Sequence, residues 1–553
     1  MIVSVTRPFL SRFSPTLIAT LSLLCGAAES FAGPDGAELY QQHCSMCHGL
    51  TGAGIPGVFP PLAGSDFLVK EREQALRAPL AGLFGKIEVN GGTYEGGMPP
   101  VLLPDEQIAA VLGYVGHAWG NHVSAPTRED IAALRATTKF HTFEALLTAM
   151  GSTELPGAPE GWELRVATEL SFSPVRLGAH PDGEHILILA ENGDVWWCRH
   201  DGSELRRLFA GASYLDATLG HPSVLGLTVD RDQRLYLVSN QRNETVSPVR
   251  NEVTIFRTAG WSREHSWTAP KPWLRTAYPW GVGPYNHGVS TIAQGPDGLI
   301  YVNSGSRTDD GEAGTLPNYA TTGEAPITAC LWRLNPQDDQ PVVEIFARGL
   351  RNNYGFTWDD DGHLLSAENG PDADAPEELN LVEQGKHYGF PYQFSDWTTK
   401  PYPHTPEVPA GLVITRPFRN LGPDGGGSAR GLFTFEPHSS PAGMVWLGAD
   451  WPTPFNSSFL VARFGNLLKR GADTGFDVLQ LRPNFPARTT ATRRVLAPLA
   501  RPIDILKLPE HQLAIAEYCR GTTLAAGIGT PGRILLLSPK HSTATSLNIS
   551  PRR

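Results

Sequence analysis

A repeated pairing of a polar turn with an apolar strand most constrains how this chain can fold. From about residue 156 onward, six short turns rich in Asp, Gly and Asn each precede a run of β-prone residues, at steps of roughly 50 to 100 residues. The turn centres are Gly183, Gln233, Gly298, Gly362, Ser458 and His511. Repeats of this length are typical of propeller blades. The sequence therefore predicts an all-β propeller of six blades over residues 156–541, with a β-sandwich as the alternative.

The composition agrees with a turn-rich β protein of more than one domain. The 58 glycines and 47 prolines are together about a fifth of the 553 residues. A chain of this length is expected to form two or more domains. The formal net charge of −11 argues against nucleic acid and against an anionic membrane surface as partners. Residues 542–553 are expected to be a flexible tail.

The N-terminus has the pattern of an export signal. Arg7 and Arg12 precede an apolar stretch at 17–28, and the segment Ser30-Phe31-Ala32 forms a small-x-small cleavage site. The apolar stretch is shorter than the ~20 residues that a membrane span needs, so an uncleaved anchor is the weaker alternative. We expect a signal peptide over residues 1–32. The mature chain is then periplasmic or otherwise exported, without a membrane span.

Residues 43–48, HCSMCH, contain a Cys-x-x-Cys-His motif. In such a motif Cys44 and Cys47 bond to the vinyl groups of a c-type haem, and His48 takes one axial position on the iron. A redox cysteine pair would need a thioredoxin-like α/β frame, and a zinc site would need a second pair of ligands nearby. The sequence shows neither feature, so we predict a covalently bound haem c.

The second axial ligand of the haem iron is expected to be Met98. Ligation by His and Met is typical of electron-transfer cytochromes. Met98 lies in the segment GGMPP, where glycines and prolines on both sides favour a rigid loop that could hold the thioether on the iron. Met46 lies between the two cysteines and faces the wrong way. A methionine in a surface loop is the alternative interpretation of Met98.

The residues around this motif resemble the class I cytochromes c. AELYQQHCSMCHG resembles the N-terminal helix that leads into the haem, and FPPLAGSD resembles the loop after it. DEQIAAVLGYVGHAWG is apolar at helical spacing and resembles the closing helix. The resemblance implies a small all-α cytochrome c domain over residues 33–122. A further helix, TREDIAALRATT, is predicted to begin after Thr127 as its N-cap, within a helical connector over 123–155.

The phase of the repeats predicts which distant residues meet. His287, Arg351 and Arg501 each lie about ten residues before the marked turn of their repeat. Equivalent positions in equivalent blades have the same height around one axis, so we expect the three side chains at one end of the central channel. The segment Asn369-Gly370-Pro371 follows a strand of the fourth repeat and is expected to reach the same basin. Such a basin suits an anionic cofactor, a metal ion and a polar substrate.

Two segments resemble the soluble glucose/sorbosone dehydrogenases. One is residues 347–391, which begin ARGLRNNYGF and contain AENGPDADAPEELN; the other is NHGVSTIAQGPDGLIYVNSGSR, around His287. The resemblance extends over residues 160–540. Members of this family are six-bladed quinoproteins that use pyrroloquinoline quinone (PQQ) and calcium. The resemblance therefore implies an enzyme that oxidises a sugar or a related polyol or aldehyde.

The resemblance also implies roles for single residues. His287 corresponds to the general base, a task that suits a neutral imidazole. Arg351 corresponds to the arginine beside the reactive quinone oxygens, where a fixed cation stabilises negative charge. The residues that correspond to other contacts of the cofactor are Asn352, Asn369, Arg501 and, with a looser match, Lys469 or Arg470. Gly370 and Pro371 correspond to the main-chain carbonyls that hold calcium, which prefers oxygen ligands.

Three positions depart from the family pattern. Asn286 stands where an acid often precedes the base, and His221 stands where Gln or Glu often lies near the substrate. Ile503 stands where some members have a second arginine. These differences bear on the identity of the substrate and on how the quinone is held.

The sequence therefore predicts an exported quinohaemoprotein dehydrogenase. The propeller would oxidise its substrate with PQQ, and the fused haem would pass the electrons to an external acceptor, such as a soluble cytochrome or a respiratory chain. The tether keeps the haem at a high local concentration. The alternatives are a haem-d nitrite reductase, which needs eight blades, a calcium-dependent lactone hydrolase, which needs carboxylate ligands in the channel, and a non-catalytic propeller that docks redox partners.

Overall fold

The structure is a computed structural model that describes most of the chain between residues 36 and 540. The described ranges are 36–54, 59–98, 100–101, 103–138, 155–220, 222–281, 287–313, 323–373, 375–395, 400–426, 434–466, 474–519 and 531–540. The predicted signal peptide and tail, His221, Asn286 and Lys469 with Arg470 lie outside the described residues. Within those ranges, every helix is too short or too polar to cross a bilayer.

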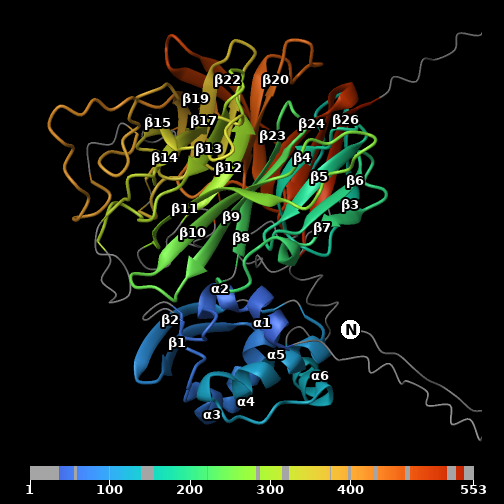
Figure 1. Ribbon diagram of the computed structural model, residues 1–553, viewed down its shortest axis with the longest axis vertical. Helices are drawn as coiled ribbons and strands as arrows, with labels where there is room; N and C mark the ends of the chain where they lie inside the picture. Colours follow the sequence, from blue (N-terminus) through green and yellow to red (C-terminus); the bar gives the residue numbers. More distant parts are fainter. Residues whose placement is uncertain are drawn as a thin grey trace, which may run out of the picture.

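Six antiparallel sheets stand around a central axis in the larger domain (Figure 1). Blade 1 consists of β4 (Pro174–Ala179), β5 (His185–Ala190), β6 (Val195–Arg199) and β7 (Arg206–Phe209). Blade 2 consists of β8 (Pro222–Val229), β9 (Leu235–Asn243), β10 (Arg250–Arg257) and β11 (Lys271–Pro279). Blade 3 consists of β12 (Val289–Gln294), β13 (Ile300–Ser304), β14 (Cys330–Leu334) and β15 (Glu344–Arg348). The first strand of each blade lies nearest the axis.

The remaining blades complete the ring. Blade 4 consists of β16 (Gly355–Trp358), β17 (Leu364–Glu368) and β18 (Glu378–Leu381). Blade 5 consists of β20 (Pro441–Leu447), β21 (Ser458–Arg463), β22 (Asp477–Asn484) and β23 (Thr489–Leu496), with β19 (Arg419–Pro423) parallel to β23. Blade 6 consists of β24 (Pro502–Leu508), β25 (Gln512–Glu517), β26 (Arg533–Pro539) and β3 (Trp162–Glu169).

The ring is closed by a strand from the start of the domain. β3 pairs with β26 near the end of the chain, with Leu164 opposite Leu537. This pairing joins the first and last parts of the propeller and leaves no open gap between blades. The prediction of six blades is confirmed, which removes the eight-bladed nitrite reductase from the alternatives.

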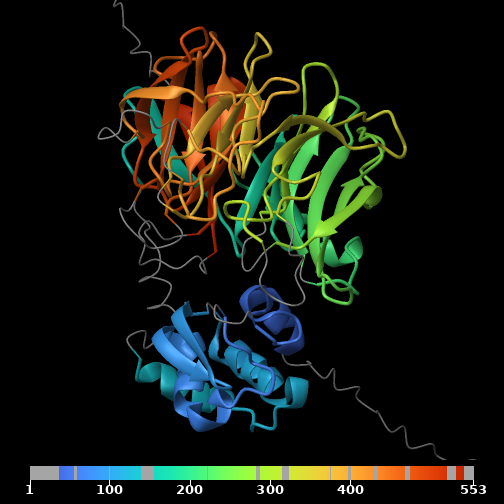
Figure 2. The ribbon, with the colours of Figure 1, turned by 90° about the vertical axis from the view of Figure 1, so that its left-hand side faces the viewer.

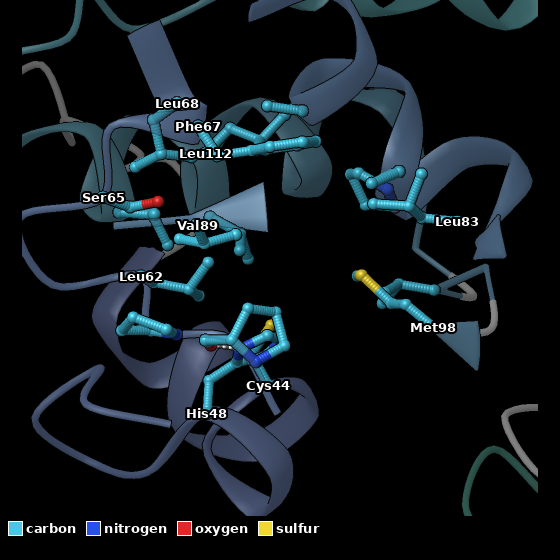
Figure 3. A pocket seen from close by; sticks show the side chains of 18 of the residues that line it. Cys44, His48, Leu62, Ser65, Phe67, Leu68, Leu83, Val89, Met98 and Leu112 are labelled. Atoms are coloured by element: carbon cyan, nitrogen blue, oxygen red, sulfur yellow. Dashed lines mark hydrogen bonds between the residues drawn. The ribbon is translucent and has the colours of Figure 1, made fainter. Parts of the chain in front are cut away.

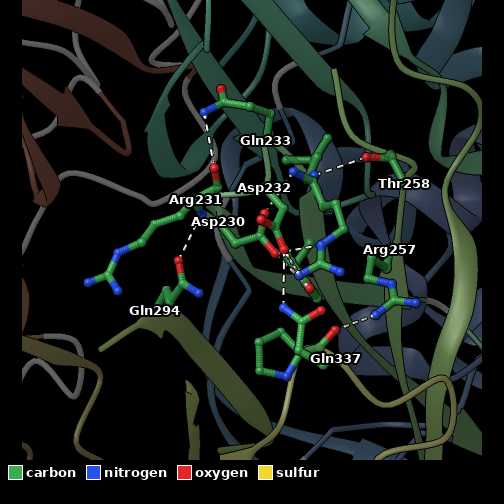
Figure 4. Close-up of polar contacts among 12 residues, drawn as sticks. Asp230, Arg231, Asp232, Gln233, Arg257, Thr258, Gln294 and Gln337 are labelled. Atoms are coloured by element: carbon green, nitrogen blue, oxygen red, sulfur yellow. Dashed lines mark hydrogen bonds and ion pairs between the residues drawn. The ribbon is translucent and has the colours of Figure 1, made fainter. Parts of the chain in front are cut away.

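All six marked turns lie between the first and second strands of a blade or at the start of the second strand. Glycine is favoured where the backbone is left-handed, as at Gly298 (φ 85°) and Gly362 (φ 84°), although Gln233 adopts a similar φ of 60°. In blade 2 an ion pair supports the turn, because Arg234 Nε donates to Asp230 Oδ2 over 2.7 Å (Figure 4). The same turn bonds to blade 3, where the Arg231 amide donates to Gln294 Oε1 over 2.8 Å.

Two other turns use histidine in the same way. In blade 1, Asp182 Oδ2 lies 2.9 Å from His180 Nδ1 and 2.7 Å from His185 Nδ1. In blade 4, Asp359 Oδ2 lies 2.8 Å from His363 Nδ1. Because an arginine makes the corresponding bond in blade 2, these His–Asp clusters are explained as supports of the blade turns.

The core of the propeller lies between neighbouring sheets. Strand β5 in blade 1 and strand β21 in blade 5 are buried along their whole length. Strands covered on both faces are rich in apolar residues without alternation. One cluster packs the aromatic side chains of Trp162, Trp451 and Phe455 where blades 5 and 6 meet. The blades therefore form one continuous frame that fixes the loops at both ends of the channel.

The smaller domain contains the helices that the sequence predicts, together with a hairpin that it does not. Its helices are α1 (Gly36–His43), α2 (Ser45–His48), α3 (Phe67–Lys70), α4 (Arg72–Ala81), α5 (Asp105–His117) and α6 (Arg128–Ala136). Short 3-10 turns lie at η1 (Ala118–Gly120), η2 (Gly211–Ser213) and η3 (Pro509–His511), the last two in the propeller. Thr127 caps α6, since its hydroxyl accepts from the Asp130 amide and the Asp130 carboxylate accepts from the Thr127 amide.

The unpredicted hairpin joins β1 (Leu83–Val89) to β2 (Gly92–Met98). Asn90 and Gly91 both have positive φ, 51° and 77°, which is the backbone of a type I′ turn. Met98 is therefore the last residue of a strand, where the sequence predicted a rigid loop. Among the described residues of this mainly helical domain, the hairpin departs from the predicted all-α class.

The cytochrome domain lies at one end of the propeller, next to the loop between β9 and β10 (Figures 1 and 2). Glu244 in this loop lies close to Gly49, which directly follows the haem-attachment motif. The first strands of the blades also begin at this end, so the predicted basin at His287 and Arg351 opens toward the cytochrome.

Candidate haem and dehydrogenase sites

A cavity opens in the cytochrome domain beside the Cys-x-x-Cys-His motif (Figure 3). Cys44 and His48 lie on one side of it, and the Met98 sulfur points into it from the other. The rest of the lining is almost entirely apolar and includes Leu62, Phe67, Leu83, Val89 and Leu112. An apolar cavity between a histidine and a methionine fits a haem, whose porphyrin ring is apolar and whose iron takes an axial ligand on each face.

His48 is prepared for ligation by its hydrogen bond. Its Nδ1 lies 2.9 Å from the Pro60 carbonyl oxygen, so Nδ1 carries the proton and donates, and Nε2 keeps its lone pair. Burial lowers the pKa of His48, which favours the neutral imidazole that binds a metal. Cys44 lies at the edge of the same cavity, whereas the side chain of Cys47 lies outside the described part of the structure. The axial role of Met98 stays a prediction.

The second site lies at the start of blades 3 and 4 and is centred on His287. Its Nδ1 lies 3.1 Å from the carbonyl oxygen and 3.0 Å from the hydroxyl of Ser306. The Ser306 hydroxyl donates to the Thr308 carbonyl over 2.7 Å, so it accepts from the imidazole. Nδ1 therefore carries the proton and Nε2 carries a lone pair. This tautomer suits a base.

The charge state of His287 agrees with that task. Burial, and then the nearby Arg351 cation, lower the pKa of His287 to about 3. The imidazole is therefore neutral at every physiological pH and able to accept a proton. The same interaction shows that the structure brings His287 and Arg351 together, as the phase of the repeats predicted.

Arg351 is buried and held in one orientation by Asp309, a residue that the sequence analysis missed. Arg351 Nη2 lies 2.5 Å from Asp309 Oδ1, and Arg351 Nε donates to the Asp309 carbonyl over 2.9 Å. Tyr402 donates to the other carboxylate oxygen of Asp309 over 2.6 Å. The short acidic run TDDGE at 308–312 was the available signal in the sequence. A fixed guanidinium can stabilise negative charge that develops on a bound group.

The loop after β17 joins the same site. Arg351 Nη1 donates to the Asn369 carbonyl over 3.2 Å, and the Asp372 amide donates to Asp309 Oδ1 over 3.1 Å. Gly370 and Pro371 lie between these two anchor points. The predicted calcium-binding carbonyls are therefore within the loop that is bonded to the Arg351–Asp309 pair.

Asn352 provides an observation that points to a bound group. Its carbonyl accepts from the Asn369 amide over 3.0 Å, which fixes the two residues relative to each other. Its side-chain Oδ1 is buried and accepts no hydrogen bond from any residue that the structure describes. A buried amide oxygen of this kind is costly unless it has a partner. A polar cofactor bound beside Asn352 and Arg351 would supply this partner.

Arg501 lies at the equivalent position of blade 6, immediately before β24, and is fully buried. Its guanidinium lies 5.0 Å from the ring of Phe464 and 4.8 Å from the ring of Phe476. It also approaches the carbonyls of Gly465 and Asn466, at 3.4 and 3.3 Å. These contacts are with blade 5. Arg501 thus directly precedes the first strand of its blade, and its convergence with His287 and Arg351 and its contact with a cofactor stay predictions.

Buried carboxylates surround the Arg351 cation. Burial, together with Asp309 and Glu312, raises the pKa of Asp310 to about 7. Burial and the adjacent Glu378 raise the pKa of Glu368, which accepts a hydrogen bond from the Arg351 amide. These groups hold protons more tightly than ordinary carboxylates do, so the basin is less negative than its composition suggests.

Comparison with known proteins matches both parts of the chain. Residues 34–119 match the cytochrome c family, and residues 172–465 match the family described as Glucose / Sorbosone dehydrogenase. Cytochrome c-552 of Thermus thermophilus is 46% identical over 131 residues, which are 22% of this chain and 86% of that protein. The cytochrome c subunit of the quinone alcohol dehydrogenase of Gluconobacter oxydans is 33% identical over 110 residues, 19% of this chain and 23% of that subunit.

Solved structures of similar architecture include the apo-form of the soluble aldose sugar dehydrogenase of Escherichia coli. It is 16% identical, and the match covers 68% of this chain and 100% of that one with a TM-score of 0.47. The Glucose / Sorbosone dehydrogenase match spans more than half of the chain, in the region where His287, Arg351 and the loop at Asn369 come together. The chain thus belongs to the Glucose / Sorbosone dehydrogenase family, with a haem c-binding cytochrome c domain preceding its six-bladed propeller.

Proposed function

We propose that this protein is an exported quinohaemoprotein dehydrogenase that oxidises a sugar or a related polyol or aldehyde. The propeller holds PQQ and calcium, and the fused haem passes electrons to an external acceptor. The observation that carries this proposal is the pairing of a neutral imidazole and a fixed guanidinium, His287 and Arg351, in a chain that also has a haem-attachment motif. A dehydrogenase that passes its electrons to the fused haem explains why the chain contains both domains.

The residues of the site have separate tasks in this proposal. PQQ, when bound, supplies the carbon that accepts a hydride from the substrate. Nε2 of His287 accepts the proton of the substrate hydroxyl. The Arg351 guanidinium, fixed by Asp309, stabilises negative charge on the oxygens beside the reacting carbon. The buried Oδ1 of Asn352 accepts a hydrogen bond from the cofactor and so fixes the orientation of the cofactor.

The loop at Gly370 and Pro371 would hold the metal ion. Main-chain carbonyl oxygens are ligands that calcium accepts. Because the loop is bonded on both sides to the Arg351–Asp309 pair, its carbonyls stay in register with the guanidinium. The buried contacts of Arg501 with blade 5 make it a fixed cation, suited to a carboxylate of the cofactor.

The names of related proteins support the proposal without deciding the substrate. The Gluconobacter oxydans relative of the first domain is a subunit of a quinone-dependent alcohol dehydrogenase. The family of the second domain is named for glucose and sorbosone dehydrogenation. Both names describe a dehydrogenase, and the first relative also contributes a cytochrome c subunit to its enzyme.

A dye assay with purified protein tests the propeller alone. The protein is incubated with calcium and PQQ, and reduction of an artificial dye is followed with aldoses, sorbosone and simple polyols. We expect turnover that needs PQQ, and at least one substrate from this panel. Dye that stays oxidised with every substrate, while PQQ fails to bind, would favour a non-catalytic propeller that docks redox partners.

A further inference from the structure

The loop between β9 and β10 lies close to the peptide that contains the haem-attachment motif. Oε1 of Glu244 lies 3.9 Å from the position that a Cβ on Gly49 would occupy, which is van der Waals distance. Gly49 directly follows the axial residue His48 and has a left-handed backbone, with φ of 71°. Figures 1 and 2 show the N-terminal helices of the cytochrome domain, in dark blue, on the side that faces the propeller. The propeller therefore meets the cytochrome beside an axial ligand of the iron.

Glu244 belongs to a small cluster that is held together by charge and by an indole ring. Arg242 Nε lies 2.9 Å from Glu244 Oε1 in an ion pair, and the Arg242 guanidinium lies 5.5 Å from the centre of the Trp280 ring. The Trp280 amide donates to the Val249 carbonyl in the same loop over 2.8 Å. We call Arg242, Glu244 and Trp280 the bridge cluster. Arg242 and Glu244 are 18% and 26% exposed, so the cluster lies at the surface of the propeller.

The bridge cluster connects to the catalytic histidine through two consecutive buried residues, Ser306 and Arg307. Arg307 is fully buried, and it donates through Nη2 to the Trp280 carbonyl over 2.9 Å and through Nε to the Pro279 carbonyl over 3.0 Å. Arg307 follows Ser306, whose carbonyl and hydroxyl hold the His287 ring. The Ser306 amide also donates to the Arg351 carbonyl over 2.7 Å.

Bonds and contacts thus connect His287 to Glu244 through Ser306, Arg307, Trp280 and Arg242. Glu244 in turn lies close to Gly49, beside the haem-attachment motif. We infer that the bridge cluster is the surface on which the cytochrome docks, and that electrons pass from the propeller to the haem there. This inference rests on the proposed dehydrogenase function. It adds the internal partner surface and names its residues.

The electron balance defines what this contact must do. Oxidation of one CH–OH group to C=O releases two electrons and two protons. The haem iron takes one electron at a time, from Fe(III) to Fe(II), so the external acceptor must remove the first electron before the second can follow. The protons leave to water. The contact therefore operates twice in each turnover.

The docking half of the inference can be tested without PQQ. A nitroxide spin label at Val246→Cys sits in the β9–β10 loop, and one at Val342→Cys sits in the exposed loop after β14, at the opposite end of the propeller. Cys198, Cys330 and Cys519 are buried, which favours labelling of the introduced thiol. We expect the ferric haem to accelerate spin relaxation strongly at 246 and weakly at 342. Equal relaxation at both positions would overturn the docking surface.

The electron-transfer half is tested with a charge reversal and a matched control. Glu244→Lys places a cation beside Arg242, whereas Glu264→Lys makes the same charge change in an exposed loop at the other end of blade 2. In protein loaded with PQQ and calcium, we expect Glu244→Lys to slow substrate-driven haem reduction by about tenfold or more while dye reduction is unchanged. Glu264→Lys should leave both rates unchanged.

Failure of the proposed electron route and failure of the proposed dehydrogenase function give different results. If Glu244→Lys reduces its haem at the wild-type rate, the route through the bridge cluster is wrong. If the wild-type protein reduces no dye with any substrate, the proposed function is wrong, and the spin-label result still decides whether the bridge cluster is the docking surface.

Discussion

The haem site and the proposed dehydrogenase site of this chain are built in opposite ways. In the cytochrome domain, three of the haem-binding residues lie within six consecutive positions, and the cavity that they face is apolar. In the propeller, His287, Arg351 and Arg501 are far apart in sequence, and the site is lined by charges and main-chain oxygens. The comparison teaches that a local motif can define a covalent cofactor site, whereas a site for a dissociable cofactor depends on the whole ring of blades.

Loss of the haem-attachment cysteines should have the largest effect, because it abolishes the function of the haem site and leaves that of the propeller. Cys47→Ser removes one thioether bond, and together with Cys44→Ser it removes both covalent attachments. We expect no covalently bound haem after denaturing electrophoresis with haem staining, and full loss of substrate-dependent electron delivery to the haem. Dye reduction by the propeller should persist, because the blades close without the cytochrome. Loss of dye reduction would show that the propeller needs the haem domain.

Loss of the base should have the converse effect. His287→Ala removes the proton acceptor, and general base catalysis typically contributes about 10²- to 10⁴-fold, so we expect a decrease of that size in kcat for dye reduction. The absorption spectrum of the haem should stay unchanged. His363→Ala, in the blade 4 turn at the opposite end of the propeller, is the matched control and should keep nearly full activity. Equal losses in both variants would point to a general effect on folding.

The value of kcat/KM should stay constant between pH 5 and 8, the range in which an ordinary histidine titrates. Since the folded pKa of His287 is depressed to about 3, its neutral form persists above that pH, and its protonation should give no acidic limb in kcat/KM between pH 5 and 8. Ser306→Asp would place a carboxylate beside Nδ1 and raise this pKa, so an acidic limb should move toward neutral pH. A limb near pH 6.5 in the wild type would contradict the burial of the imidazole.

The same shift makes a contribution to stability that has a defined sign. The unfolded chain binds a proton at His287 below about pH 6.5, while the folded protein keeps the imidazole neutral. The contribution is therefore fully present above that pH and is lost as the pH falls toward the folded pKa. Denaturant titrations of wild type and His287→Gln from pH 8 to pH 4 should converge as the pH decreases.

The smallest expected effect concerns the hairpin that carries Met98. Gly91 has φ of 77° with open space around it, so Gly91→Ala introduces backbone strain and no clash. A residue with a side chain in this conformation costs roughly 1 to 2 kcal/mol. We expect a loss of that size in the unfolding free energy of the cytochrome domain, followed through haem absorption. Lys86→Ala on the same hairpin should cost less.

Sequence patterns located the elements of both sites, but only some of their contacts. The Cys-x-x-Cys-His motif and the six turns were sufficient because each is local, and the repeat phase extended the prediction to His287 and Arg351. The bond between Arg351 and Asp309, and that between Asp309 and Tyr402, could not be predicted, since they join residues 42 and 93 positions apart. The β1–β2 hairpin could have been found from Asn90-Gly91, which is a strong turn signal.

The haem spectrum during substrate addition tests the central claim most directly. Oxidised protein is loaded with calcium and PQQ, the substrate found in the dye assay is added, and haem reduction is followed by absorption. The account predicts reduction that needs both PQQ and substrate and is lost in His287→Ala. A haem that stays ferric while the dye is reduced, or one that is reduced without PQQ, would contradict the claim that the haem is the outlet for electrons from the propeller.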